Sequence, residues 1–158
     1  IHKNLVSCTG KDYCHLATIE TKEQAKRVAS RLEERLDLEK TGPISMHWSG
    51  CPAGCGNHLV ADIGLLGKKA RVNGGVVDAV DVFVGGRAGP HPRHATKILE
   101  NVPCDQLPDV LENIIPYHTR TKMHPVGKKQ GGRRRLKPKE SAEPHWPVEA
   151  ADPTPVFM

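Results

Sequence analysis

The longest regular apolar pattern in the chain lies between residues 21 and 40. Apolar side chains return there at intervals of three and four residues, with Lys, Arg and Glu between them, which is the pattern of an amphipathic helix. Thr21 followed by Gln24 fits a capping box, and Gly42-Pro43 provides a stop after Lys40. The sequence therefore predicts one helix over 21–40, whose buried face carries Ala25, Val28, Ala29, Leu32 and Leu36.

Shorter apolar runs on both sides of this helix predict strands. The stretch Asn73-Gly74-Gly75 between two such runs is a strong hairpin signal, so we expect a meander in the middle of the chain. The predicted strands cover residues 3–7, 44–48, 59–66, 70–72 and 76–84, with turns at 67–69 and 73–75.

Two more short helices are predicted after the glycine-rich segment 85–90, at residues 95–100 and 107–115. The element order is then β-α-β, a meander, and helices that cover one face of the sheet. This order predicts an α+β fold, a mixed sheet of about five strands with helices packed on it. Loops at the strand ends are where we expect a functional site.

The end of the chain differs in composition from the rest. Residues 125–158 are rich in Pro, Gly and charge, include Arg133-Arg134-Arg135, and show no apolar period. We interpret 125–158 as a disordered basic tail and 1–124 as one folded domain. The net charge of +5 divides accordingly: the domain has 16 basic and 14 acidic side chains, and the tail has 7 and 4.

Composition also narrows the class of protein. No stretch approaches the about 20 apolar residues of a membrane span, so a membrane is not an expected partner. The arginine run has no interleaved aromatic residues and no recognition fold, so nucleic acid is not expected either. The chain begins Ile1-His2 with no leader, from which we expect a fragment or processed piece in a reducing, cytoplasmic compartment.

Four of the five cysteines form two close pairs, Cys8-x5-Cys14 and Cys51-x3-Cys55. Each pair lies on a predicted loop after a strand, so adjacent strands would bring the four sulfurs together. Four thiolates bind an iron–sulfur cluster or zinc, and the five-residue step suits the larger cluster better. Zinc and four unrelated buried cysteines remain open as alternatives. Glycines near both pairs would let the backbone approach a cluster; they are Gly10, Gly50, Gly54 and Gly56.

Several motifs around these cysteines resemble the siroheme domain of assimilatory nitrite and sulfite reductases. The resemblance covers residues 3 to about 117, and Cys8-Thr9-Gly10 with Glu20-Thr21-Lys22 is more similar to the nitrite branch than to the sulfite branch. The motifs are residues 8–14, 20–22, 47–55, 61–64, 85–87 and 102–111.

The resemblance implies a 4Fe-4S cluster held by Cys8, Cys14, Cys51 and Cys55, with the Cys55 thiolate also bonding the siroheme iron. It implies ferredoxin as the electron donor and six-electron reduction of nitrite to ammonia. It also implies that the upstream half of the enzyme is missing from this chain. Two rivals stay open: sulfite reduction on the same cofactors, and a four-cysteine binding module without catalysis.

Siroheme carboxylates and nitrite both call for cationic contacts. Lys11, in the first cysteine loop, and Arg87, in a glycine-rich turn, are the candidates, with a solvated surface charge as the alternative for each. No catalytic side chain is assigned.

Four weaker candidates and the tail complete the sequence-based expectations. His47 and His58 are expected to be hydrogen-bonded to backbone rather than to metal. Trp48 and Cys104 are expected in the core. The basic tail is expected to be a neutral extension, with docking of an acidic ferredoxin as the alternative.

Overall fold

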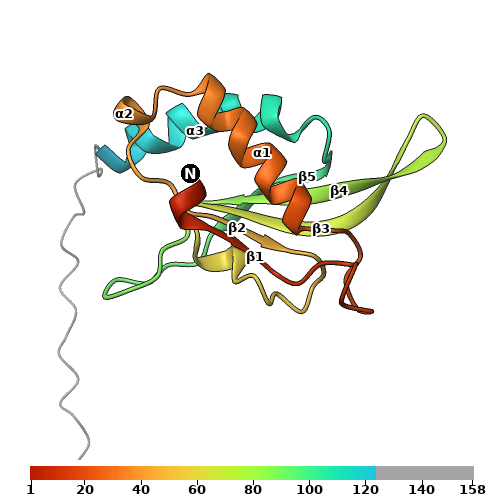
Figure 1. Cartoon of the computed structure of the whole chain (residues 1–158). Helices are drawn as coiled ribbons and strands as arrows, with labels where there is room; N and C mark the ends of the chain where they lie inside the picture. Colours follow the sequence, from red (N-terminus) through yellow and green to blue (C-terminus); the bar gives the residue numbers. More distant parts are fainter. Residues whose placement is uncertain (124–158) are drawn as a thin grey trace, which may run out of the picture. The chain divides into compact units, whose positions relative to one another are not determined.

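The computed structural model describes residues 1–123, so the predicted tail lies outside the described residues. This part folds into a five-stranded mixed sheet in the order β1-β2-β3-β4-β5 (Figure 1). The predicted α+β class and the strand number are confirmed. Within residues 1–123, no helix is long and apolar enough to cross a membrane.

The first three strands are parallel and the last two are antiparallel to their neighbours. The strands are β1 (Leu5–Ser7), β2 (Met46–Ser49), β3 (Ile63–Val72), β4 (Gly75–Val84) and β5 (Thr96–Pro103). The helices are α1 (Lys22–Arg35), α2 (Leu38–Thr41) and α3 (Leu107–Met123), with short 3-10 turns η1 (His2–Asn4) and η2 (His58–Val60).

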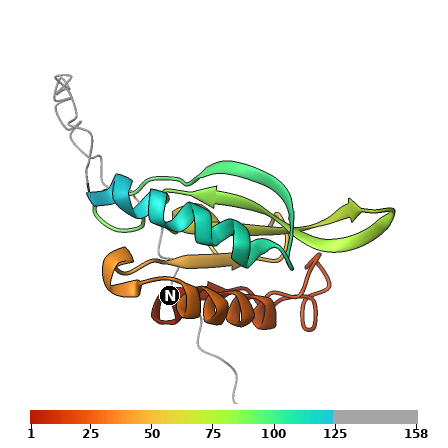
Figure 2. The ribbon, with the colours of Figure 1, turned by 90° about the horizontal axis from the view of Figure 1, so that it is seen from above.

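Helices α1 and α3 cover one face of the sheet, as Figures 1 and 2 show from two directions. Their apolar sides pack on one core that includes Trp48, Ile63 and Val80. Across the top of this core, Arg35 of α1 pairs with Asp109 and Glu112 of α3. The β1–β2 connection contains α1 and so runs over the face of the sheet that the helices cover. The β2–β3 connection contains η2, which lies on the opposite face (Figure 1).

The predicted turn at 67–69 is wrong, because β3 runs without interruption from Ile63 to Val72. Gly67 sits inside the strand opposite Val80. An ideal Cβ on Gly67 would lie 2.5 Å from Cγ1 of Ile19, whose side chain is fully buried. The glycine therefore makes room for a core side chain, which is a known use of glycine inside strands. The strand also starts at Ile63 rather than at residue 59.

The predicted helix at 95–100 is also wrong, since these residues belong to strand β5. The free edge of β4 offers backbone hydrogen bonds that a six-residue helix could not match, and tertiary pairing overrides weak helical spacing. β5 pairs with β4 through two register shifts, and Asn101 adopts a φ of +56° there. Such irregularities make the outer edge of β5 less able to pair with a further strand.

The helix predicted over 21–40 is divided. α1 ends at Arg35 because Leu36 is extended, and α2 follows as a separate turn. The start of α1 also differs from the capping box: the Glu20 carboxylate accepts the N–H groups of Lys22 at 2.7 Å and Glu23 at 3.0 Å. An acidic side chain suits the positive end of a helix. The Thr21 hydroxyl is thereby left for another contact.

Substituting Gly67 by Ala should destabilise the domain by about 1–3 kcal/mol, because the new methyl group overlaps Ile19 in a packed core. Urea unfolding measures the effect. Gly75→Ala is the control, since its Cβ would meet nothing nearer than Val72 O at 3.6 Å. Equal stability of the two variants would contradict the close packing of Gly67 on Ile19.

Candidate functional site

Both cysteine pairs lie on loops that follow neighbouring parallel strands, as the sequence predicts. β1 ends directly before Cys8, and β2 ends shortly before Cys51. The two strands are parallel neighbours, so their carboxyl ends lie at the same end of the sheet. We call residues 8–21 the first cysteine loop and residues 50–57 the second cysteine loop; Figure 1 shows both below the helices.

Three hydrogen bonds join the first cysteine loop to the end of β2 and to the second cysteine loop. The Cys8 N–H donates to the Trp48 carbonyl at 3.0 Å, and the Thr18 N–H donates to the Gly50 carbonyl at 2.8 Å. In the third, the Gly50 N–H donates to Cys8 Sγ at 3.1 Å. Gly50 thus contacts the first loop through both its N–H and its carbonyl. The position of one loop therefore fixes the position of the other.

A tight turn sets the position of Cys14 in the first cysteine loop. Its N–H donates to the Gly10 carbonyl at 3.0 Å. Gly10 has a φ of +79°, and an ideal Cβ there would lie 2.9 Å from Thr21 Oγ1, so the turn needs glycine. The Thr21 hydroxyl donates to the Cys8 carbonyl at 3.0 Å. The Thr21 hydroxyl oxygen also lies 3.6 Å from Cys8 Sγ.

The second cysteine loop folds back against β2. The Gly54 N–H donates to the Cys51 carbonyl at 3.2 Å. Gly56, directly after Cys55, donates its N–H to Ser49 Oγ at 3.2 Å. An ideal Cβ on Gly56 would lie 1.9 Å from a carbonyl oxygen of β2, so no other residue fits. The backbone beside Cys55 is therefore held tightly to the strand.

All four thiols are free: Cys8, Cys14 and Cys51 are half-buried and Cys55 is exposed. The loops adjoin as expected, but within residues 1–123 no three His, Cys, Asp or Glu side chains lie close enough to hold one metal ion. Zinc needs all its thiolates about 2.3 Å from a single ion, whereas a four-iron cluster gives each thiolate its own iron. Four free thiols on two joined loops are the kind of donor set that iron–sulfur clusters use.

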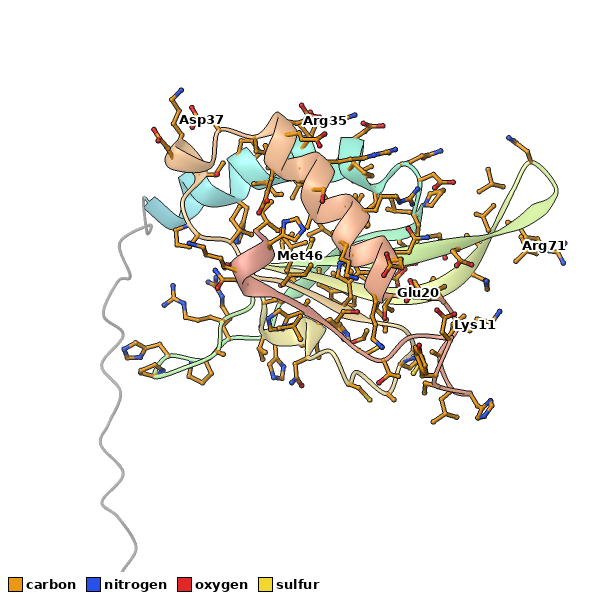
Figure 3. The ribbon with its side chains drawn as sticks, in the orientation of Figure 1. Lys11, Glu20, Arg35, Asp37, Met46 and Arg71 are labelled. Atoms are coloured by element: carbon orange, nitrogen blue, oxygen red, sulfur yellow. The ribbon has the colours of Figure 1, made fainter. Side chains whose placement is uncertain are left out.

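Lys11 and Arg87, the candidate anion contacts, lie at opposite ends of the sheet. The exposed Lys11 side chain points away from the sheet at the first cysteine loop (Figure 3). Arg87 follows β4, whose last residue Val84 pairs with Ile63, the first residue of β3. The structure therefore does not bring the two cations together. Arg87 lines a hollow of about 390 Å³ with residues that include Ser45, His47 and Asp62.

Trp48 and Cys104 are buried in the core, as predicted, and burial raises the pKa of the Cys104 thiol to about 12. His47 Nδ1 donates to a backbone carbonyl of the second cysteine loop at 3.1 Å, which confirms the expected kind of contact. His58 differs from the expectation, since its Nδ1 lies 3.0 Å from the Ser49 hydroxyl oxygen. Burial lowers the pKa of His58.

Sequence reasoning missed two residues that shape the site. Ser49 holds the second cysteine loop, and Thr21 contacts Cys8 instead of capping α1. The only sequence signal for Ser49 is its place directly before Gly50-Cys51, since a short hydroxyl side chain at a strand end often bonds nearby backbone. Thr21 carries no such signal, because its partner is 13 residues away.

Two adjoining loops with four free thiols at the ends of parallel strands are the arrangement expected of a domain that holds a cofactor through cysteines. Residues 2–137 match the family described as the nitrite and sulphite reductase 4Fe-4S domain. The match covers most of the chain, and the chain belongs to this family. The resemblance noted in the sequence is thereby confirmed.

Relatives of the chain agree with this family. It is 45% identical over 115 residues to the ferredoxin-nitrite reductase of Synechococcus elongatus, covering 73% of this chain and 22% of the relative. It is 41% identical over 114 residues to the chloroplastic ferredoxin-nitrite reductase of Spinacia oleracea, covering 72% and 19%. The chain therefore spans about a fifth of the length of the curated relatives it matches.

A solved structure supports the fold as well. The NirA protein of Mycobacterium tuberculosis superimposes with a TM-score of 0.66 at 27% identity, over 82% of this chain and 24% of that protein. The mixed sheet with its helices is thus shared with a protein of known structure.

Replacing Thr21 by Val removes the hydroxyl but keeps the volume. We expect a loss of about 1–3 kcal/mol of stability, because the carbonyl of half-buried Cys8 loses the donor that the buried Thr21 side chain provides. Thermal unfolding compares it with Thr41→Val, whose exposed hydroxyl donates to the Asp37 carbonyl at 3.0 Å and should matter little. A similar midpoint shift in both variants would show that Thr21 does not support the first cysteine loop.

Proposed function

We propose that Cys8, Cys14, Cys51 and Cys55 hold a 4Fe-4S cluster and that the Cys55 thiolate also ligates a siroheme iron. The observation that carries this proposal is the joining of the two cysteine loops through Gly50, whose N–H donates to Cys8 Sγ at 3.1 Å. Hydrogen bonds to cysteine sulfurs are one of the means by which proteins tune iron–sulfur clusters.

The difference in exposure among the four thiols supports the division of roles. Cys55 is exposed, whereas its three companions are half-buried. A thiolate that serves a second group must have open space beside it, and of the four only Cys55 is exposed. Its neighbour Gly56 holds the backbone in place, so the thiol is accessible on a fixed loop.

The reaction we propose is the six-electron reduction of nitrite to ammonia with ferredoxin as the donor. The support is the name ferredoxin-nitrite reductase among the relatives and the family's description. Bound siroheme supplies the reducible metal site for the substrate; this chain's residues hold and orient the cofactor. Because the chain spans about a fifth of these relatives, catalysis requires protein that lies outside this chain.

Two finer assignments belong to the same proposal. Lys11 and Arg87 provide separate anion contacts, since they lie at opposite ends of the sheet. We propose a cytoplasmic location for this chain, although the plant relatives carry chloroplastic in their names.

The test is siroheme loading of the anaerobically reconstituted chain, followed by absorption spectroscopy. Cys55→Ser should lose the haem band, because a hydroxyl is a poor ligand in place of a thiolate. Cys104→Ser is the control, since that thiol is buried in the core and away from the loops. It should keep the band.

A wild-type chain that takes up a cluster but never siroheme would remove the second half of the proposal. A Cys55→Ser chain that retains the haem band would assign the shared thiolate to another cysteine. Binding of nitrite and of sulfite to the loaded chain, each followed as a shift of the haem band, then compares the two substrates named by the family.

A further inference from the structure

The second cysteine loop is held by side chains that do not ligate metal in the proposed function. Ser49 is fully buried at the end of β2, and its Oγ accepts the N–H of Gly56 at 3.2 Å. The same oxygen lies 3.0 Å from His58 Nδ1. A hydroxyl has two acceptor positions and one proton, so Ser49 can serve both partners at once. We call Ser49, Gly56 and His58 the serine–histidine brace.

His58 is itself fixed on several sides. It is 6% exposed, and its ring packs against the Phe83 ring in a T-shaped arrangement at a centroid distance of 5.1 Å. Its carbonyl lies against Gly64 of β3, where an ideal Cβ would approach to 1.9 Å. The ring therefore cannot turn freely, and it holds the Ser49 hydroxyl in one orientation.

His47 secures the far end of the same loop. Its Nδ1 lies 3.1 Å from the Asn57 carbonyl, and because a carbonyl only accepts, the imidazole must donate there. Asn57 has a left-handed φ of +53° and donates its own N–H to the Gly54 carbonyl at 2.8 Å. The residues on both sides of Cys55 are thus anchored, although its side chain is exposed.

The Cys51 half of the loop is held by other contacts: the Gly54 N–H donates to the Cys51 carbonyl, and Gly50 bonds to the first cysteine loop. The direction of the Cys55 thiol depends on where Gly56 and Asn57 lie, and these depend on the two histidines. A ligand held to within fractions of an ångström needs such supporting hydrogen bonds.

We propose that His58 acting through Ser49, and His47 acting through Asn57, are positioning residues that set the direction of the Cys55 thiolate toward its cofactor. This inference rests on the proposed function, in which Cys55 is a ligand. It assigns these histidines neither metal ligation nor proton transfer.

The test uses one pair of disruptive variants, one rescue and one control. Ser49→Ala and His58→Leu remove the brace. His58→Asn places a polar amide atom near the position of Nδ1 and should rescue it. Val80→Ala is the control, because it opens a cavity in the core under the helices and leaves the loop contacts intact.

Two readouts separate the brace from the cofactor. In the metal-free chain, hydrogen exchange at the Gly56 amide should accelerate about tenfold or more in the disruptive variants, because that N–H loses its acceptor geometry. In the reconstituted chain, the same variants should lose iron to a chelator several-fold faster and change the electron paramagnetic resonance line shape of the reduced cluster. The Asn variant should resemble wild type, and Val80→Ala should lower only the melting temperature.

Unchanged exchange at Gly56 in both disruptive variants would overturn the brace. Faster exchange with wild-type iron retention and line shape would overturn its role in positioning Cys55. A wild-type chain that takes up no cluster would overturn the proposed function and this inference together, and the exchange data would still show whether Ser49 and His58 hold the loop.

Discussion

The contact of the Gly50 amide with Cys8 Sγ, at 3.1 Å, joins two parts of the chain that are 42 residues apart. It can form only because β1 and β2 are parallel neighbours that release their loops at the same end of the sheet. The Gly50 carbonyl accepts the Thr18 N–H at 2.8 Å and completes the link. The two cysteine pairs therefore have a common frame, and the helix that separates them in sequence is packed above the sheet.

Close packing around glycine gives this frame its rigidity. Gly56 and Gly64 have no space for a Cβ, because one presses on β2 and the other on the carbonyl of His58. Gly67 also has no space for a Cβ, because the Ile19 side chain packs against it on the face covered by the helices. The sheet thus accommodates close neighbours on both faces, core side chains above and the connection through η2 below. The loops take their positions from backbone contacts and from side chains other than cysteine, such as Ser49 and Thr21, which leaves the cysteine side chains available for a cofactor.

The sequence was sufficient for the features that depend on local pattern. The α1 periodicity, the Asn73-Gly74-Gly75 hairpin and the loop placement of the cysteines all follow from neighbouring residues. The secondary-structure predictions were wrong where a residue distant in the sequence determines the local structure. Gly67 belongs to a strand because Ile19 needs its space, and residues 96–103 form a strand because β4 has an edge to pair. Ser49, Thr21 and His58 could not be assigned for the same reason, since their partners appear only after folding.

The central claim is that the two joined loops bind one 4Fe-4S cluster. The most direct test is iron, acid-labile sulfide and zinc analysis with Mössbauer spectroscopy on the anaerobically reconstituted chain. The account predicts about four irons and four sulfides per chain, with the spectrum of one four-iron cluster that disappears when Cys8 is replaced by Ser. Stoichiometric zinc without sulfide, or a cluster that persists without Cys8, would contradict it.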